Sequence, residues 1–244
     1  MAHTDQMRAR IARACDCFAG GVIAATVLIS HPRLGATPLG ELGNAHVVPI
    51  AGVLAATFYL PLNGESSPRW CALVWRLRTA ALLTTGLAPF VSWWLRTDDN
   101  VYFLLLGAAA IYAGIWCLLE LNALARELLQ GAAAAERVRA QVAAGRIFLF
   151  YFVFIPTVGV HVSFLIACIV YRGSSLSDLR RTWHFLPPLL RYLMVLAVLH
   201  LTVLLWGLHR HIPARPFGAG TEGGKDTGND REDCGRGAAV DRGA

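Results

Sequence analysis

Two histidines lie deep within apolar stretches of the sequence, where an ionisable side chain is costly and is therefore a candidate for function. His161 is residue 15 of 25 in the stretch 147–171, and His200 is residue 12 of 20 in the stretch 189–208. If these stretches form consecutive antiparallel helices, the two imidazoles lie at a similar depth. Facing histidines could ligate haem b or a metal ion, or could relay protons. The alternative is two neutral histidines, each hydrogen-bonded to a neighbouring hydroxyl or carbonyl.

One carboxylate and two arginines form a second group. Glu120 ends the apolar stretch 101–121, and Arg76 and Arg78 lie near the start of the stretch 71–95. In antiparallel helices these three side chains reach the same level, so we expect an ion pair between Glu120 and one of the arginines. The alternative is a carboxylate that couples to protons or ions.

Two prolines suggest a third kind of site. Pro49 and Pro156 lie within apolar stretches and have similar surroundings, Val-Pro-Ile-Ala-Gly-Val and Ile-Pro-Thr-Val-Gly-Val. Inverted-repeat transporters bind small solutes beside broken helices of this kind. Against a repeat, 29 residues separate Pro49 from Arg78, whereas 35 separate Pro156 from Arg191, so the halves do not align continuously.

Motifs of known enzyme classes are missing from the sequence. It contains no GxSxG, no HExxH, no P-loop and no dinucleotide-binding glycine pattern. Cys15 and Cys17 are the only closely spaced cysteines, and they form neither a CxxC pair nor a pair with a nearby histidine. We therefore expect no enzyme activity and no cofactor, unless His161 and His200 hold one.

The composition identifies the elements that must position these residues. The chain has 244 residues, of which 55% are apolar and 16% are charged, whereas soluble domains carry about 25% charged residues. Long apolar stretches alternate with short arginine clusters. This pattern predicts an all-α, polytopic helical membrane bundle in contact with the lipid bilayer. It excludes a secreted disulfide scaffold, a nucleic-acid-binding domain and an ordinary cytosolic enzyme.

Six transmembrane helices are predicted. Their ranges are 18–30, 45–62, 71–95, 101–121, 147–171 and 189–208. The first is short unless it extends back to Ile11, and with its preceding arginines it resembles a signal peptide. No convincing cleavage site follows it, so we predict an uncleaved helix.

The distribution of basic residues predicts the orientation. Sixteen of the 22 basic residues fall in the two termini and in the second-to-third and fourth-to-fifth connections. The positive-inside rule then places both termini in the cytoplasm, and we expect a bacterial inner membrane. The predicted organisation is a cytoplasmic segment 1–17, a membrane domain 18–211 and a disordered, glycine-rich cytoplasmic tail 212–244.

The connection 122–146 has apolar residues at helical spacing, which predicts a cytoplasmic helix bent near Gly131. It could dock a membrane-protein partner, or it could pack on its own bundle or on the lipid surface. Three functional classes remain open. We favour a non-enzymatic membrane scaffold or accessory subunit, followed by a small-solute transporter and then a haem- or metal-binding protein.

Overall fold

The computed structural model describes residues 2–30, 45–62, 67–96, 101–130, 136–170 and 188–208, and these residues form six helical rods. The first four rods are α1 (Ala2–Ser30), α3 (Val47–Thr57), α4 (Pro68–Arg96) and α5 (Val101–Gln130). The fifth is a continuous rod formed by α6 (Glu136–Phe148), the π-helical segment η2 (Leu149–Phe154) and α7 (Ile155–Val170). The sixth is α9 (Pro188–Leu208). The prediction of an all-α fold is confirmed.

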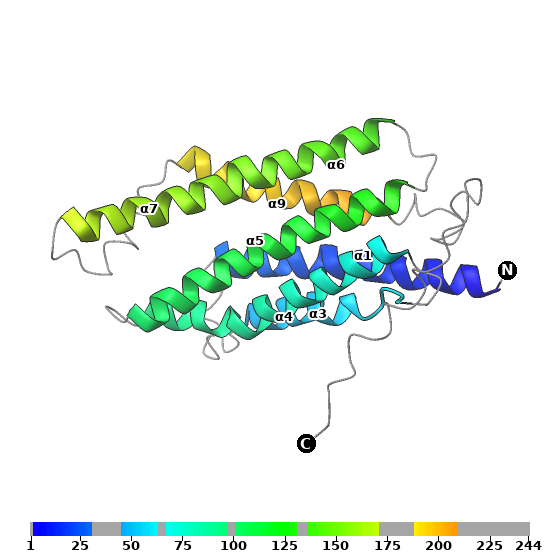
Figure 1. The fold of residues 1–244 in the computed structure, drawn as a ribbon, viewed down its shortest axis with the longest axis horizontal. Helices are drawn as coiled ribbons and strands as arrows, with labels where there is room; N and C mark the ends of the chain where they lie inside the picture. Colours follow the sequence, from blue (N-terminus) through cyan, green and yellow to red (C-terminus); the bar gives the residue numbers. More distant parts are fainter. Residues whose placement is uncertain are drawn as a thin grey trace, which may run out of the picture.

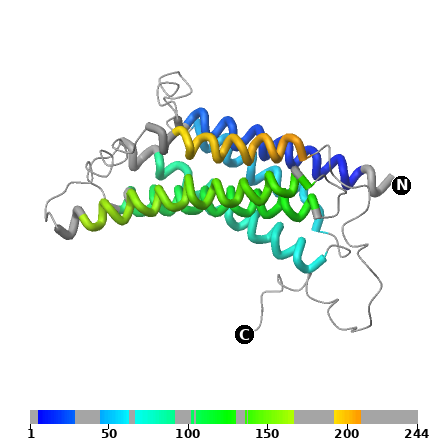
Figure 2. The backbone as a smooth tube through the Cα atoms, turned by 90° about the horizontal axis from the view of Figure 1, so that it is seen from above, coloured from blue at the N-terminus to red at the C-terminus, as the bar shows by residue number. Residues whose placement is uncertain are grey.

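The rods alternate in direction along one long axis (Figure 1). α1 packs against α3 and α9, and α4 packs against α3 and α5. The rod of α6 and η2 lies between α5 and α9, so the six rods close into a ring. Figure 2 shows α9 alongside α1.

Most of the basic residues that the structure describes lie at one end of the bundle. The beginnings of α1, α4 and α6 and the ends of α3, α5 and α9 lie together there (Figure 1). Ten of the twelve arginines in the described ranges fall in the parts of the helices nearest this end: Arg8, Arg10, Arg13, Arg69, Arg76, Arg78, Arg126, Arg137, Arg139 and Arg146. We call it the arginine-rich end.

The interior is aliphatic and tightly packed. Phe18, Leu77, Leu121 and Leu201 bring side chains from four different rods into one core. α1 and α3 approach so closely at Gly21 that a Cβ atom there would lie 2.9 Å from the Pro49 carbonyl oxygen. Small residues permit such close approach between helices in a membrane, where packing drives association.

The outer surface is apolar on every rod. Large exposed side chains include Val27 on α1, Leu82 on α4, Leu105 on α5, Leu165 on α7 and Val203 on α9. An apolar surface spread over a whole bundle matches contact with lipid.

The hydrogen bonds of the threonines also suit a bundle surrounded by lipid. Each of the seven threonines whose side chain is described donates its hydroxyl to a carbonyl three or four residues earlier. This local bond satisfies the hydroxyl without water.

Three helical segments are long and apolar enough to cross a membrane, namely Gln6–Leu28, Leu105–Leu129 and Val138–Ile166. The predicted first span, 18–30, overlaps the first of these and lies within α1, which is continuous from Ala2 to Ser30. α4 has the length to cross, but it carries Arg69, Arg76 and Arg78 near its start. The described residues thus contain three candidate spans, and the count of six stays a prediction.

The second predicted span, 45–62, was too long. α3 has 11 residues and ends at Thr57, so it is about 16 Å long, against about 30 Å for the hydrocarbon core of a bilayer. Pro61 explains part of the error, because a proline disfavours helical geometry in the residue before it.

The connection 122–146 is helical on both sides of residues 131–135, which lie outside the described residues. α5 continues through Asn122 to Gln130, and α6 begins at Glu136. Leu124, Leu128 and Val142 are buried in the core of the bundle itself. The apolar face of this connection therefore packs on its own chain. The predicted tail 212–244 also falls outside the described residues.

Candidate functional site

Two ion pairs join α4 to α5 near the arginine-rich end. Arg69 Nε lies 3.2 Å from Glu127 Oε2, and Arg76 Nε lies 3.4 Å from Glu120 Oε1. The arginines are seven residues apart on α4, and the glutamates are seven apart on α5 in the opposite order. Since seven residues make about two helical turns, one antiparallel register aligns both pairs.

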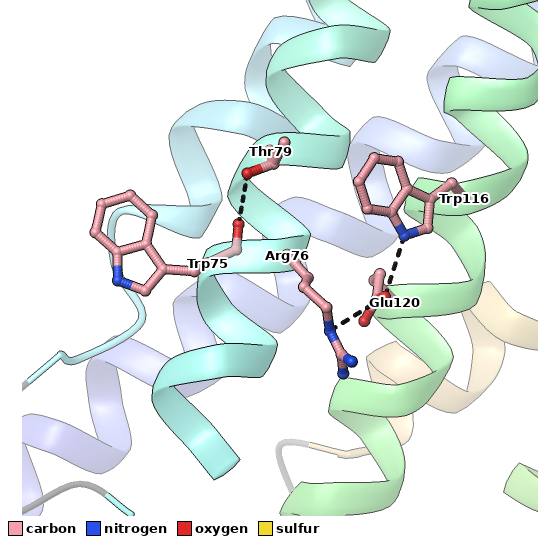
Figure 3. Close-up of polar contacts among 5 residues, drawn as sticks. All are labelled: Trp75, Arg76, Thr79, Trp116 and Glu120. Atoms are coloured by element: carbon pink, nitrogen blue, oxygen red, sulfur yellow. Dashed lines mark hydrogen bonds and ion pairs between the residues drawn. The ribbon is translucent and has the colours of Figure 1, made fainter. Parts of the chain in front are cut away.

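Glu120 is the most buried charged residue in this group. Its residue surface is 9% exposed, and Oε1 accepts a hydrogen bond from Trp116 Nε1 at 3.1 Å as well as the contact from Arg76 (Figure 3). Oε2 is buried and has no hydrogen-bond partner among the described residues. The predicted pair thus forms with Arg76, and one carboxylate oxygen remains unsatisfied.

Arg78 has a different set of partners. Its Nη2 donates to the carbonyl oxygens of Thr57 and Leu60, at 3.3 and 3.4 Å. The guanidinium carbon lies 4.9 Å from the centre of the Phe58 ring and 5.7 Å from that of Trp75. A cation at the carboxyl end of a helix satisfies carbonyls that lack intrahelical partners. Arg78 therefore fastens the end of α3 to α4.

A third polar contact joins α5, α6 and α9. Asn122 donates from Nδ2 to the Val142 carbonyl at 3.3 Å, and His200 Nε2 lies 3.1 Å from the Gln141 carbonyl. Both side chains meet α6 at Gly145, where a Cβ atom would lie 2.8 Å from Asn122 Nδ2 and 3.3 Å from His200 Cδ2. Gly145 thus allows two neighbouring rods to reach the backbone of α6.

His161 lies in a different part of the bundle from His200. Its Nδ1 lies 2.7 Å from the Thr157 carbonyl, and its ring lies 5.4 Å from that of Tyr112, while Nε2 is buried without a hydrogen-bond partner among the described residues. His200 packs on Phe148, 13 residues before His161 on the same rod. Thirteen residues of helix span about 20 Å. The structure does not bring the two histidines together.

The described residues contain no group of three or more His, Cys, Asp or Glu side chains placed to hold a metal ion. Two histidines separated by this distance cannot share a haem iron, which takes both axial ligands within a few ångströms. The geometry therefore gives no support to the haem or metal site.

The two prolines occupy unlike positions. Pro49 is the third residue of α3, in the first turn, where no intrahelical amide bond is lost. Pro156 is the second residue of α7, two residues after the π-helical segment η2 ends, inside a continuous rod. Proline lacks an N–H and crowds the carbonyl four residues earlier, and a widened π turn relieves that conflict. Of these two prolines, Pro156 is the one beside an irregularity within a helix.

Several contact residues were not singled out in the sequence. Arg69, Glu127, Trp116, Asn122 and Gly145 all take part in contacts between rods or at the ion pairs. The seven-residue spacing of Arg69 to Arg76 and of Glu120 to Glu127 is a signal that could have identified the paired register. Nothing local in the sequence distinguishes Asn122 or Gly145.

Comparison with models of known protein families, with curated proteins and with solved structures finds no match to this chain.

Proposed function

We propose that this chain is a multi-pass protein of a bacterial inner membrane, with both termini in the cytoplasm, and that it acts as a non-enzymatic scaffold or accessory subunit. One observation carries the proposal. Polar side-chain atoms join one rod to another at five residues, namely Arg69, Arg76, Arg78, Asn122 and His200. Polar groups that hold helices together stabilise a bundle and are expected of a structural protein in lipid.

A partner would bind the exposed face of α6. Because Leu128 and Val142 are buried in the chain's own core, the apolar face of the 122–146 connection is already occupied. The opposite face is exposed at Ala140, Ala143 and Ile147, which follow helical spacing. A partner helix could pack there without disturbing the bundle.

The scaffold role is tested by cross-linking in intact membranes, mild detergent extraction and quantitative mass spectrometry. We expect a stoichiometric membrane-protein partner that is lost in the double variant Ala140→Glu/Ala143→Glu. The matched control is Ala9→Glu, at an exposed position of α1, which should retain the partner. A wild-type protein that purifies alone, or a partner unaffected by the α6 change, would contradict the proposal.

Topology needs a separate test. A reporter that is active only in the cytoplasm should be active when it is fused to the end of α9 and also when it is fused to the start of α1. An external C-terminus would reject the arrangement with both termini inside.

Small-solute transport is the second candidate, favoured by the π-helical segment beside Pro156. π segments often mark functional sites within helices. A water-filled path there would make Thr157→Cys, at a fully buried position, reactive toward a membrane-impermeant maleimide in a variant whose six native cysteines are replaced by alanine. An unreactive thiol in the folded protein would reject a path at this position.

A further inference from the structure

One face of α4 is exposed along much of its length. The exposed residues Arg69, Ala72, Arg76, Thr79, Leu83 and Gly86 recur at alternating spacings of three and four, with Trp75 and Leu82 beside them. This spacing describes a single stripe on a helix. We call these eight residues the α4 outer stripe.

The stripe changes character along its length. Arg69 and Arg76 occupy the part nearest the arginine-rich end, and their side chains are 67% and 59% exposed. Beyond Arg76 the stripe is apolar except for Thr79, whose hydroxyl donates to the Trp75 carbonyl at 3.0 Å (Figure 3). The stripe thus pairs two cations with an apolar strip whose one hydroxyl is already satisfied.

Both arginines keep donors available. Each contacts its glutamate through Nε, and the described residues give neither arginine a second partner. A guanidinium has five N–H donors in a planar fork that suits a phosphate. The two side chains therefore offer outward-facing donors while their ion pairs stay intact.

We propose that the α4 outer stripe binds an anionic phospholipid, with the phosphate of its headgroup at Arg76 and Arg69 and an acyl chain along Thr79, Leu82 and Leu83. Charge complementarity supports this occupant, because the described ranges near the arginine-rich end hold ten arginines against five acidic residues. Within the stripe, Trp75 lies on the side away from Glu120 (Figure 3). Tryptophan is favoured at the level of lipid headgroups. The inference rests on membrane insertion, and it does not depend on a scaffold role.

The test compares phosphatidylglycerol with phosphatidylcholine of identical acyl chains. The full chain is equilibrated with an equimolar mixture of the two lipids in micelles, and the retained lipids are counted by native mass spectrometry. We expect wild type to retain phosphatidylglycerol about tenfold more than phosphatidylcholine, since each arginine near an anionic headgroup contributes about fivefold and the glutamates offset part of this. Equal retention would overturn the proposal.

The site variant replaces both ion pairs by glutamines: Arg69→Gln, Arg76→Gln, Glu120→Gln and Glu127→Gln. This variant leaves the net charge unchanged and no buried charge unpaired, so it should remain folded, and the preference should fall to about onefold to twofold. The double variant Arg76→Gln/Glu120→Gln repeats the test at one pair. A preference that survives in folded samples of either variant would overturn the proposal.

The control removes two arginines from the same end of the bundle. Arg10→Gln/Arg13→Gln, at exposed positions of α1, lowers the net charge by two and should keep the preference. If this control loses the preference while the site variant keeps it, a general electrostatic attraction explains the binding and the proposed site is wrong.

Two further measurements locate the lipid and identify its source. Phosphatidylglycerol with brominated chains should quench tryptophan fluorescence more than brominated phosphatidylcholine, and Trp75→Phe should remove the excess. Millimolar inorganic phosphate should not displace the lipid, because the acyl chain contributes to binding. Excess quenching in Trp75→Phe, or displacement by phosphate, would overturn the proposal. Failure to reconstitute into bilayers at all would reject membrane insertion, which is a different outcome.

Discussion

Replacing Arg76 should destabilise the protein far more than replacing Glu120, although either change removes the same ion pair. The Glu120 side chain is 12% exposed and that of Arg76 is 59% exposed. In Arg76→Gln, the buried carboxylate keeps only the hydrogen bond from Trp116. In Glu120→Gln, the amide oxygen can still accept from Trp116, and the exposed Arg76 is solvated without strain.

The magnitude follows from the burial of the two partners. Removing one partner of a fully buried ion pair costs about 3–5 kcal/mol, whereas an exposed pair contributes about 0–1 kcal/mol. Because one partner here is buried and the other is largely exposed, we expect about 2 kcal/mol for Arg76→Gln. For Glu120→Gln we expect about 0.5 kcal/mol or less. The double variant Arg76→Gln/Glu120→Gln should recover most of the stability that Arg76→Gln loses. The coupling free energy between the two substitutions should be about 1.5 kcal/mol.

The assay is reversible unfolding of the purified protein in mixed micelles by titration with sodium dodecyl sulfate, followed by circular dichroism. Thermal unfolding gives a second measure, and about 2 kcal/mol corresponds to roughly 4–8 °C in Tm for a chain of this size. The reasoning is refuted if Glu120→Gln costs as much as Arg76→Gln. It is also refuted if the double variant is no more stable than Arg76→Gln alone.

Three further substitutions and one control test the contacts between rods, each by the same unfolding titration. Gly21→Ala should lower the free energy of unfolding by about 1–3 kcal/mol, because its Cβ would lie 2.9 Å from a backbone oxygen of α3. In the control Gly20→Ala the new Cβ meets nothing within 4 Å, so the free energy of unfolding should rise by about 0.5–1 kcal/mol. Equal effects would show that α1 and α3 are not closely packed. Gly145→Ala should cost about 1–3 kcal/mol because it displaces the Asn122 amide, and a neutral result would contradict the α5–α6 contact. Arg78→Met should lower the free energy of unfolding by about 1–2 kcal/mol, because it removes the side-chain donor to the Thr57 and Leu60 carbonyls at the end of α3. Unchanged stability would mean that Arg78 does not hold α3.

The helices themselves were largely predictable from the sequence. The predicted stretches 71–95, 101–121, 147–171 and 189–208 begin or end within a few residues of an observed helix boundary, or lie inside a longer helix. An apolar segment must satisfy its own backbone hydrogen bonds, and helix formation does so locally. The same reasoning overestimated the segment 45–62, because apolar residues continue beyond the last helical residue, Thr57.

The axial and rotational placement of each helix was not predictable. In the sequence, Arg76 and Arg78 are equally good candidates for the ion pair with Glu120. Only the packing of α4 on α5 turns Arg76 toward Glu120 and Arg78 toward α3. Likewise, equal positions within two apolar stretches suggested that His161 and His200 face each other. The actual register places His200 beside Phe148, well before His161 on the rod.

The sequence by itself determined that this chain is helical, that its surface is suited to lipid, and that its arginines gather toward one end. These properties depend on composition and on the order of apolar and charged segments along the chain. Only the tertiary structure decided which polar side chains meet, which face of the 122–146 connection is buried, and that α4 presents a stripe with arginines at one end. Those outcomes depend on the rotation and sliding of each helix, which are set by the simultaneous packing of six rods distant in sequence.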